Sequence, residues 1–377
     1  MIEFDLNNRV AIVTGGAQGF GLAITERFIQ SGAKVIIWDI DENECKKAIS
    51  KINSKNCNFQ IVDVRQIKEV ETKLDDAEKN ADLNITVMVD ATLSATEAPH
   101  FSEHIAIEKV PPGRNCSSLL AVASESDHII LIAPETQGIL LDSLIAVEQA
   151  GLGDRLINCP VPFIRAASDK QTTCAMLAAA GIPTPAGCTL PAGGSIPTGF
   201  RIPAVLKARE SAGCDGLRII QNCSDFVTPE IDSRLECHIS GIPGSVCCLC
   251  RNDSIVPLLP FEQMFTHAQQ PVYIGGRVAH EDYHARMQSL AVRSIEALNK
   301  ATQATARGWV GVDMILGSRD DGNDDRVLEI NPRLTTSFIG LSRGQQGGLI
   351  YPLLNHMHGG EIHLTPWNIE ACEFSVA

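Results

Sequence analysis

The sequence predicts two structural classes in one chain, a parallel α/β sheet at the N-terminal end and an α+β block behind it. Three observations support this prediction. Apolar strands alternate with amphipathic helices over residues 9–90, which is the pattern of a parallel sheet with right-handed crossovers. The alternation stops after Asp90, where a proline-containing loop follows. From about residue 200 onward, short strands are joined by turns.

The N-terminal elements follow one another closely. Residues 9–15 are an apolar run that ends in glycine, which predicts a buried strand. The segment TGGAQGFG comes next, and LAITERFIQSGA then has helical spacing up to Gly32. KVIIWDI predicts a second strand with Asp39 at its end, ENECKKAISKIN a polar-faced helix, and NFQIVDV a third strand. A charged helix over 66–80 and a strand over 84–90 complete the alternation.

The middle of the chain is less regular. We expect residues 83–165 to complete the N-terminal sheet, with a strand over 127–135 (DHIILIAPE) followed by a helix. The segment 166–181 predicts another helix, with Ser168 as its N-cap and Gly181 as its end.

The C-terminal block contains the short apolar segments PAVLKA, GLRII, LECHIS, SVCCLC and PVYIG. A helix over 283–305 separates these from a last pair of strands, GWVGVDMILG and RVLEINPR, which an acidic turn connects. The expected domains are therefore residues 1–82, 83–165 and 166–377.

Composition excludes several classes of protein. The chain has 377 residues, of which 44% are hydrophobic and 20% charged, so wholesale disorder and a fibrous fold are excluded. The net charge of −14 argues against nucleic acid or an anionic membrane surface as the main partner. No apolar run reaches about 18 residues, so we expect no membrane span. The polar start MIEFDLNNRV does not have the pattern of a secretory signal.

The 13 cysteines are an odd number without framework spacing, which argues against a secreted disulfide scaffold. We therefore expect a reducing, cytoplasmic location. Cys247, Cys248 and Cys250 form the only cluster, in the apolar segment SVCCLC. Buried strand thiols explain this cluster, whereas a metal site would need a second pair that the sequence lacks.

The first motif places Gly15, Gly19 and Gly21 between a strand and a helix. Glycines there permit a tight turn and let helix N–H groups face a pyrophosphate, and Asp39 stands where an acid would hold a ribose hydroxyl. With Asp63 in IVDV, the stretch 8–80 resembles the Rossmann-like start of a short-chain dehydrogenase/reductase.

That family also needs a tyrosine followed four residues later by lysine. Here Tyr273, Tyr283 and Tyr351 are followed at that offset by arginine, methionine and asparagine. Three interpretations stay open for the N-terminal stretch: a layer that binds nothing, a site for a nicotinamide dinucleotide, NAD(P), and a dehydrogenase.

Two lysines form the second motif. Lys207 lies within an apolar strand, where its charge is costly unless it meets an anion. The small-residue loop 211–216, with Gly213 and Gly216, begins four residues later and can close backbone N–H groups over a phosphate. Lys170 lies in the first turn of a predicted helix. The alternatives are an ordinary hairpin turn and a solvated surface lysine.

The third motif is the pair GWVGVDMILG and RVLEINPR. Both segments alternate with period two, so Glu329 and Asn331 share one face of a strand, and Asp313 can reach that face across the hairpin. Clustered carboxylates repel without a cation, and these oxygen ligands suit Mg²⁺ or Mn²⁺ bound with nucleotide phosphates. Arg333 could hold a phosphoryl or carboxylate oxygen. The alternative is a hairpin with incidental acids.

Taken together, Lys170, Lys207 with its loop, LECHISG, Asp313 and EINPR resemble the ATP-grasp superfamily. DHIILIAPET, the SDK helix and YIGG are most similar to its carboxylate–amine ligase branch, which includes tyramine–glutamate ligases and carbamoyl-phosphate-synthase-like proteins. The resemblance covers about residues 85–360 and implies an ATP-grasp domain of two lobes.

The resemblance also implies the role of each site residue. Lys170 and Lys207 would contact the ATP phosphates together with the loop residues Gly213 and Gly216. The hinge beside adenine would be Glu236, Cys237 and Ile239. The metal ligands would be Asp313, Glu329 and Asn331, and the catalytic residues Arg333 and Lys207. The loop reads Glu-Ser-Ala-Gly-Cys where related sequences usually have Asp-Gly-Ala-Gly-Gly.

The implied activity is an ATP- and Mg²⁺-dependent ligase that joins a small-molecule carboxylate to an amine through an acyl phosphate. Phosphoryl transfer is mostly positioning and charge neutralisation, so no protein nucleophile is needed. Two alternatives remain: a non-catalytic ATP-binding protein, and an NAD(P)-binding oxidoreductase of the short-chain dehydrogenase type.

Overall fold

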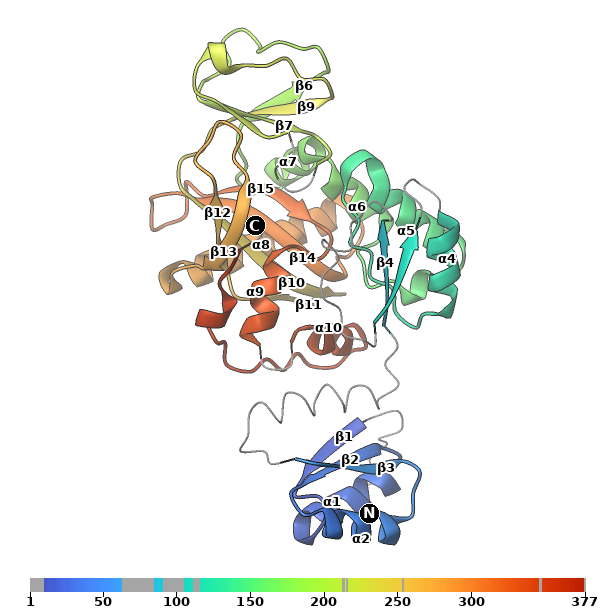
Figure 1. Cartoon of the computed structure of the whole chain (residues 1–377). Coiled ribbons are helices and arrows are strands. Elements are labelled where there is room, and N and C mark those ends of the chain that lie inside the picture. Colours follow the sequence, from blue (N-terminus) through green and yellow to red (C-terminus); the bar gives the residue numbers. More distant parts are fainter. Residues whose placement is uncertain are drawn as a thin grey trace. The chain divides into compact units, whose positions relative to one another are not determined.

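The structure is a computed structural model. It divides into two compact units, Met1–Gly113 and Arg114–Ala377, and each is described here by itself (Figure 1). The residues that it describes are 10–62, 85–90, 105–110, 116–211, 214, 216–252, 254–345 and 348–375.

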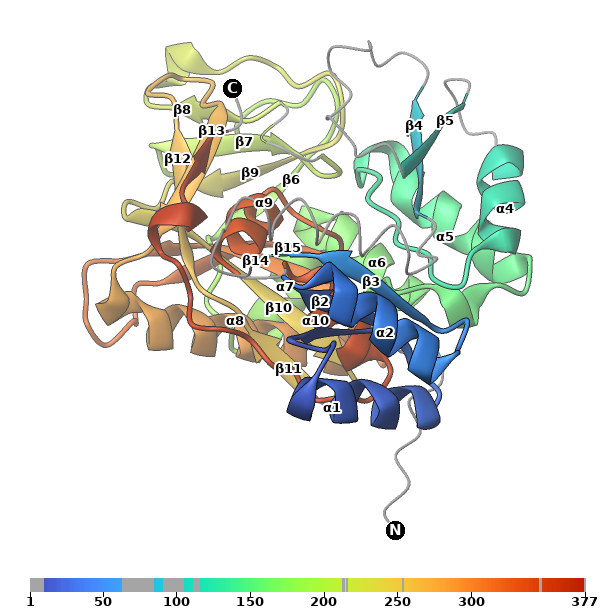
Figure 2. The same cartoon turned by 60° about the horizontal axis from the view of Figure 1, so that its bottom comes forward.

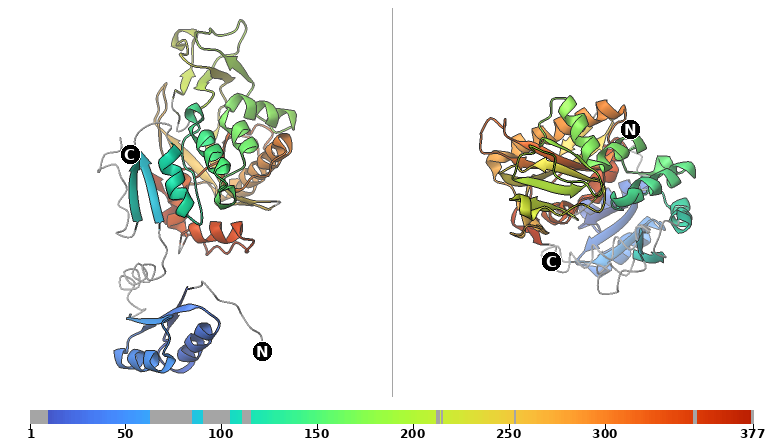
Figure 3. Two further views of the ribbon diagram at one scale, coloured as in Figure 1. Left: turned by 90° about the vertical axis from the view of Figure 1, so that its right-hand side faces the viewer. Right: turned by 90° about the horizontal axis from the view of Figure 1, so that it is seen from above.

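The first unit begins with a three-stranded parallel sheet in the order β1-β2-β3, as the sequence predicts. Two helices cover one face of this sheet (Figure 3). The side chains of Val13, Val35 and Ile37 pack in the core between that face and the helices. The elements are Val10–Thr14 (β1), Gly19–Gln30 (α1), Lys34–Asp39 (β2), Glu42–Ile52 (α2) and Cys57–Ile61 (β3).

The turn between β1 and α1 requires its glycines. Gly15 and Gly19 have φ values of +63° and +55°, in the left-handed region that favours glycine. A Cβ atom on Gly21 would lie 2.0 Å from the carbonyl oxygen of Gly15. The expected strand-to-helix turn of a parallel sheet is confirmed.

Two further strands in this unit, Ile85–Asp90 (β4) and Ile105–Val110 (β5), pair in parallel in a sheet of their own and do not join β1–β3. The charged helix expected over 66–80 lies outside the described residues, as does Asp63. The domain boundaries after residues 82 and 165 stay predictions.

The second unit begins with helices. The strand expected over 127–135 is wrong, because this segment has only an isolated bridge between Ile129 and Leu156. Two residues further on, the backbone of Leu131 bonds to a side chain in place of a neighbouring strand. The Leu131 N–H donates to Asn158 Oδ1, and Asn158 Nδ2 donates to the Leu131 carbonyl, both at 2.8 Å. The helices are Cys116–Glu125 (α4), Ile139–Gln149 (α5), Val161–Ser168 (α6) and Lys170–Ala179 (α7).

The expected N-cap of α7 is also wrong by one residue. Ser168 is the last residue of α6, and Asp169, in extended backbone, accepts a hydrogen bond of 3.0 Å from the N–H of Gln171. Asp169 therefore caps α7, and Lys170 becomes the first residue of that helix.

Two antiparallel sheets follow, which agrees with the predicted α+β class (Figures 1 and 2). The smaller sheet has the order β6-β9-β7-β8. Its strands are Gly187–Leu190 (β6), Ala204–Ala208 (β7), Arg218–Ile220 (β8) and Ser233–Cys237 (β9).

The larger sheet has the order β15-β14-β10-β12-β13-β16, and β11 pairs with β10. Its strands are Ile242–Arg251 (β10), Ser254–Pro257 (β11), Phe261–Phe265 (β12), Tyr273–Val278 (β13), Gly308–Leu316 (β14), Arg326–Asn331 (β15) and Phe374–Ser375 (β16). The helices around it are Glu281–Thr302 (α8), Ser337–Gly344 (α9) and Ile350–Met357 (α10).

The cysteine cluster belongs to the cores on the two faces of this sheet. Cys248 and Cys250 pack with residues of α8, whereas Cys247 packs with Trp309 and residues of α9 and α10. All three are free and buried, and burial raises the pKa of each thiol. They are strand-core thiols, as their apolar segment indicates. No helix among the described residues is long and apolar enough to cross a membrane.

The close approach of α1 to the glycine turn can be tested by Gly21→Ala. The added methyl group would overlap the Gly15 carbonyl, so we expect the first unit to lose roughly 1–3 kcal/mol of stability. Hydrogen exchange of the full chain should then be faster within residues 10–62 and unchanged over β14 and β15. Ala23→Ser, at an exposed position of α1, should change stability by less than about 0.5 kcal/mol. Wild-type protection in Gly21→Ala would contradict the described turn.

Candidate active site

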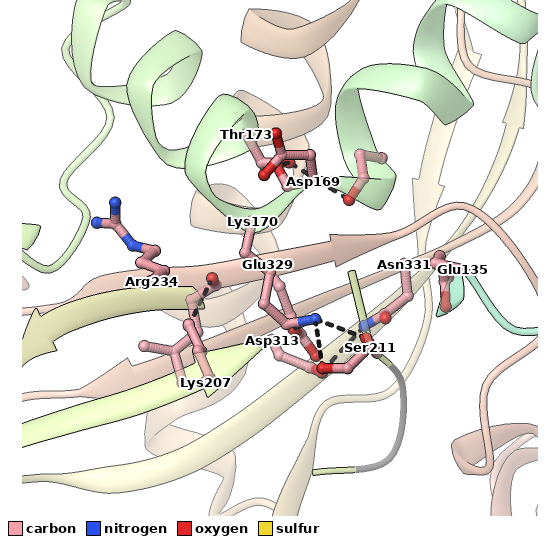
Figure 4. Close-up of polar contacts among 12 residues, drawn as sticks. Glu135, Asp169, Lys170, Thr173, Lys207, Ser211, Arg234, Asp313, Glu329 and Asn331 are labelled. Atoms are coloured by element: carbon pink, nitrogen blue, oxygen red, sulfur yellow. Dashed lines mark hydrogen bonds and ion pairs between the residues drawn. The ribbon is translucent and has the colours of Figure 1, made fainter. Parts of the chain in front are cut away.

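Several charged side chains gather where α7 and the smaller sheet meet β14 and β15 (Figure 4). Lys170 begins α7, Lys207 is on β7 and Glu236 on β9. Asp313 is on β14 and Glu329 on β15. Residues far apart in sequence thus form one cluster, as the motifs predict.

Lys170 is held at both ends. Its backbone N–H donates to the Arg209 carbonyl at 3.0 Å. Its Nζ donates to the Ser211 carbonyl at 2.6 Å and lies 3.2 Å from Oε2 of Glu329. Only 9% of the Lys170 side chain is exposed, and a buried ammonium group is stabilised by oxygen partners of this kind.

Lys207 has a second carboxylate partner. Its Nζ lies 2.8 Å from Oε1 of Glu236, and both side chains are almost completely buried. The other Glu236 oxygen accepts a 2.8 Å hydrogen bond from Nε of Arg234, whose guanidinium also donates to Gln171 and to the Pro185 carbonyl. Burial alone would lower the pKa of Lys207, but Glu236 and Glu329 outweigh it and raise that pKa.

The acidic residues lie opposite each other on β14 and β15. Asp313 pairs in register with Glu329. Nδ2 of Asn331 donates to Oδ2 of Asp313 at 3.0 Å, and Nε2 of Gln263 donates to Oδ1 of Asp313 at 3.2 Å. The expected common face of Asp313, Glu329 and Asn331 is therefore present.

The strict period-two alternation expected for RVLEINPR is wrong at Leu328. Met314 pairs with Val327 and Asp313 with Glu329, so Leu328 is an extra residue on β15, a β-bulge. The bulge lets Val327 and Ile330 pack in the same core. It also turns the Leu328 carbonyl toward Lys207, whose Nζ lies 3.5 Å away.

The two carboxyl groups have opposite pKa shifts. Burial and the nearby charge of Glu329 raise the pKa of Asp313 to about 7. Burial would also raise the pKa of Glu329, but Lys170 and then Lys207 hold it below its ordinary value. Repulsion between clustered acids was expected from the sequence. It falls on Asp313, because Glu329 already has two cationic neighbours.

This donor set fits a divalent cation. Two carboxylates and an amide oxygen are ligands that Mg²⁺ and Mn²⁺ prefer, and rotation of the Asn331 amide would turn its oxygen toward Asp313. No group of three or more His, Cys, Asp or Glu side chains suited to a metal exists in the part of the chain that the structure describes. The metal ligands stay a prediction.

The predicted phosphate loop is described only in part, since Gly213 lies outside the described residues. Ser211 is buried against Lys170, and Gly216 has a φ of +71°. In the predicted hinge, Glu236 turns its carboxylate toward Lys207 and Arg234. The N–H of Cys237 donates to the Ala186 carbonyl. Ile239 follows β9, and a contact of these residues with adenine stays a prediction.

Sequence reasoning missed two site residues. Arg234 is almost completely buried and holds Glu236 in place, and its spacing of two from Glu236 on one strand could have indicated this pair. Glu135 forms an ion pair with the predicted catalytic Arg333. These two residues are 198 positions apart, and no local pattern connects them.

The predicted dinucleotide residues Gly15, Gly19, Gly21 and Asp39 lie in the first unit. Asp39 is buried, and its oxygens accept hydrogen bonds from the N–H groups of Ala17 and Asp41 at 3.3 and 3.2 Å. Its carboxylate therefore stabilises the glycine turn. NAD(P) binding at this turn stays a prediction.

Three family models match parts of this chain. Residues 167–337 match the family model described as an ATP-grasp domain, and residues 83–163 match the pre ATP-grasp 3 domain. The matched ranges contain the two lysines, the paired strands and Glu135. This chain contains an ATP-grasp domain.

Solved structures share this fold. An ATP-grasp superfamily protein from Archaeoglobus fulgidus aligns with a TM-score of 0.51 and 21% identity, over 72% of this chain and 75% of that one. An L-amino acid ligase from Bacillus licheniformis aligns with a TM-score of 0.57 and 15% identity, over 77% and 73%. At these identities the likeness concerns the fold alone.

The N-terminal stretch has different relatives. Residues 9–110 match the short chain dehydrogenase family model, so the overlap with the pre ATP-grasp match contains β4 and β5. An uncharacterized oxidoreductase of Mycobacterium bovis is 32% identical over 109 residues, which are 27% of this chain and 44% of that protein. The chain thus spans less than half the length of this curated relative.

The opposite pKa shifts of Asp313 and Glu329 predict that the thermal stability of variants at these positions depends on pH. The pKa of Asp313 rises from 3.8 to about 7 on folding, so its protonated form stabilises the fold below pH 3.8 and this contribution is lost as the pH rises through about 7. In metal-free buffer, Asp313→Asn should raise Tm by roughly 2–4 °C at pH 8 and by less at pH 5. Thermal unfolding at both pH values measures this.

Glu329→Gln is the matched comparison, and its effect has the opposite sign. It removes the counter-charge of Lys170, so Tm should fall at both pH values. Tm changes of the same sign and size in the two variants would contradict the assigned charge states.

Proposed function

We propose that the ATP-grasp domain binds ATP at this site and is an ATP-dependent ligase that joins a small-molecule carboxylate to an amine. The observation that carries the proposal is the position of two buried ammonium groups at β15, beside Asp313 and Asn331: Lys170 Nζ lies 3.2 Å from Glu329, and Lys207 Nζ lies 3.5 Å from the Leu328 carbonyl oxygen. A site with this arrangement of lysines and carboxylates suits a nucleoside triphosphate with its divalent cation. The L-amino acid ligase fold of the Bacillus protein supports the same class of reaction.

Lys170 and Lys207 would contact the phosphates of ATP. Both ammonium groups now lie beside carboxylate or carbonyl oxygens, so phosphate oxygens can replace or join partners of the same kind. Glu236 and Arg234 would keep Lys207 in place. One Glu236 oxygen pairs with Lys207, and the other pairs with Arg234, which holds the carboxylate in position. The segment after β9 would accept the adenine through its backbone.

Asp313, Glu329 and Asn331 would hold the cation. When bound, Mg²⁺ neutralises phosphate charge and orients the β- and γ-phosphates. The raised pKa of Asp313 means that one proton must leave this carboxyl near neutral pH before it can act as a ligand.

The reaction itself would need little from the protein beyond placement. A carboxylate oxygen of the substrate attacks the γ-phosphorus of ATP, the bond to the β,γ-bridging oxygen breaks, and ADP leaves with an acyl phosphate formed. The amine nitrogen then attacks the acyl carbon, inorganic phosphate leaves, and the amine loses a proton. Arg333 would donate to the transferring phosphoryl. The substrates are proposed to be small molecules in the cytoplasm.

The first test measures ATP binding. We expect Lys170→Gln to weaken ATP binding roughly 10-fold to 100-fold, the value of one or two charge-assisted hydrogen bonds. Isothermal titration of the full chain with ATP and Mg²⁺ measures this. Lys300→Gln, at an exposed position near the end of α8, is the matched control and should bind like wild type. Equal affinity in the two variants would overturn the phosphate assignment.

The second measurement separates a ligase from a non-catalytic ATP-binding protein. ADP formation is followed with a panel of carboxylates, each with and without a panel of amines. Amine-dependent release of phosphate together with an amide product supports the ligase. Binding of ATP without ADP formation for any pair would leave a nucleotide-binding protein. A dehydrogenase is not proposed, because no tyrosine in the sequence is followed four residues later by lysine.

A further inference from the structure

Arg333, which follows the last predicted metal ligand by two residues, is held by a carboxylate from a distant part of the second unit. Its Nε donates to both oxygens of Glu135, at 2.9 and 3.0 Å. Glu135 lies in the range that matches the pre ATP-grasp domain, whereas Arg333 lies in the ATP-grasp domain. One ion pair therefore connects the two matched segments.

The Glu135–Arg333 ion pair is largely shielded from solvent. Only 5% of the Glu135 side chain and 14% of the Arg333 side chain are exposed. A carboxylate at such a position needs its counter-charge, because an unpaired buried charge is strongly destabilising. Arg333 is the cation that pairs with it, so the guanidinium is fixed by more than its own flexible stem.

The backbone around Glu135 is also fixed. The turn after it contains Gln137 with a φ of +53° and Gly138 with a φ of +73°. The Gly138 N–H donates to the Glu135 carbonyl at 3.0 Å, and the Leu140 N–H donates to the Pro134 carbonyl at 3.1 Å. A non-glycine residue in the left-handed region is uncommon and is retained where the surroundings determine it. The Glu135 carboxylate thus extends from a hydrogen-bonded turn that precedes α5.

Among the described residues, the other two nitrogens of Arg333 make no hydrogen bond to Glu135. Nη1 donates to the Leu334 carbonyl at 3.2 Å. Nη2 has no hydrogen-bond partner among the described residues. A guanidinium with Nε engaged keeps its outer N–H groups for an oxyanion.

We infer that Glu135 is a positioning residue that orients Arg333 toward the transferring phosphoryl group. This inference rests on the proposed function and adds to it the part played by the pre ATP-grasp segment. Glu135 does not touch the phosphoryl group. It holds Nε so that Nη2 meets the oxygens of the phosphoryl as their charge develops, without reorganisation at that moment.

The test uses ADP, Mg²⁺ and orthovanadate, which together imitate ATP at the moment of phosphoryl transfer. In the full-length wild type, vanadate should strengthen ADP binding. Glu135→Gln keeps the size and one acceptor oxygen but loses the charge. We expect it to bind ADP alone like wild type, and to lose roughly 10-fold to 100-fold of the strengthening by vanadate.

A matched control removes another buried arginine–carboxylate pair. Arg286 pairs with Asp325, whose side chain is only 3% exposed, four positions along the chain from Glu329. Asp325→Asn should lower Tm at least as much as Glu135→Gln while keeping the full effect of vanadate. A merely structural role of Glu135 predicts the same vanadate effect in both variants.

A double-mutant cycle completes the test. Arg333→Met should lose the vanadate effect, and adding Glu135→Gln to Arg333→Met should cost nothing further, because Glu135 acts through Arg333. An additive loss in the double variant would overturn the inference. So would an undiminished vanadate effect in Glu135→Gln, or the absence of a vanadate effect in the wild type. A wild type that binds no ADP would overturn the proposed function itself, and this inference with it.

Discussion

The site depends on the burial of two lysine charges. Lys170 lies on α7 and Lys207 on β7, and a buried ammonium group must have an anion beside it. Glu236 and Glu329 satisfy this requirement, and they come from different sheets. The Lys170–Glu329 pair therefore joins α7 to β15, and Lys207 of the smaller sheet reaches the Leu328 carbonyl of β15. Arg234 completes the charge balance at Glu236.

Much of this was predictable from local patterns. A lysine amid apolar strand residues indicates an anion, and Lys207 has one in Glu236. Residues two apart on a regular strand share a face, so the sequence was also enough to place Glu329 and Asn331 on one face. The parallel sheet of the first unit followed from its alternating strands and helices. Glycine at position 21 was identified correctly because nothing larger fits between α1 and the turn.

The rest depends on contacts that no local pattern contains. Leu131 pairs with the side chain of Asn158 rather than with a strand, so its apolar segment looked like a strand without being one. The bulge at Leu328 arises from pairing with β14. Which carboxyl of an acidic pair keeps its proton depends on where the lysines end up, and Glu135 reaches Arg333 only through the tertiary fold.

The bulge at Leu328 changes which residues of β15 share a face in the β14–β15 hairpin. On the turn side of it, Val327 faces the core; beyond it, Ile330 does so, although the two residues are three apart. An insertion in the turn at 317–325 leaves this count unchanged, so the hairpin can change its length there without moving an acidic side chain. Between Val327 and Glu329 the extra residue sets the faces, because a ladder in which Leu328 paired regularly would put the carboxylate and a core side chain on the same face. The geometry thus separates the turn, where a change of length leaves the two faces as they are, from the bulge, where the pairing of a single residue decides which side chains share a face.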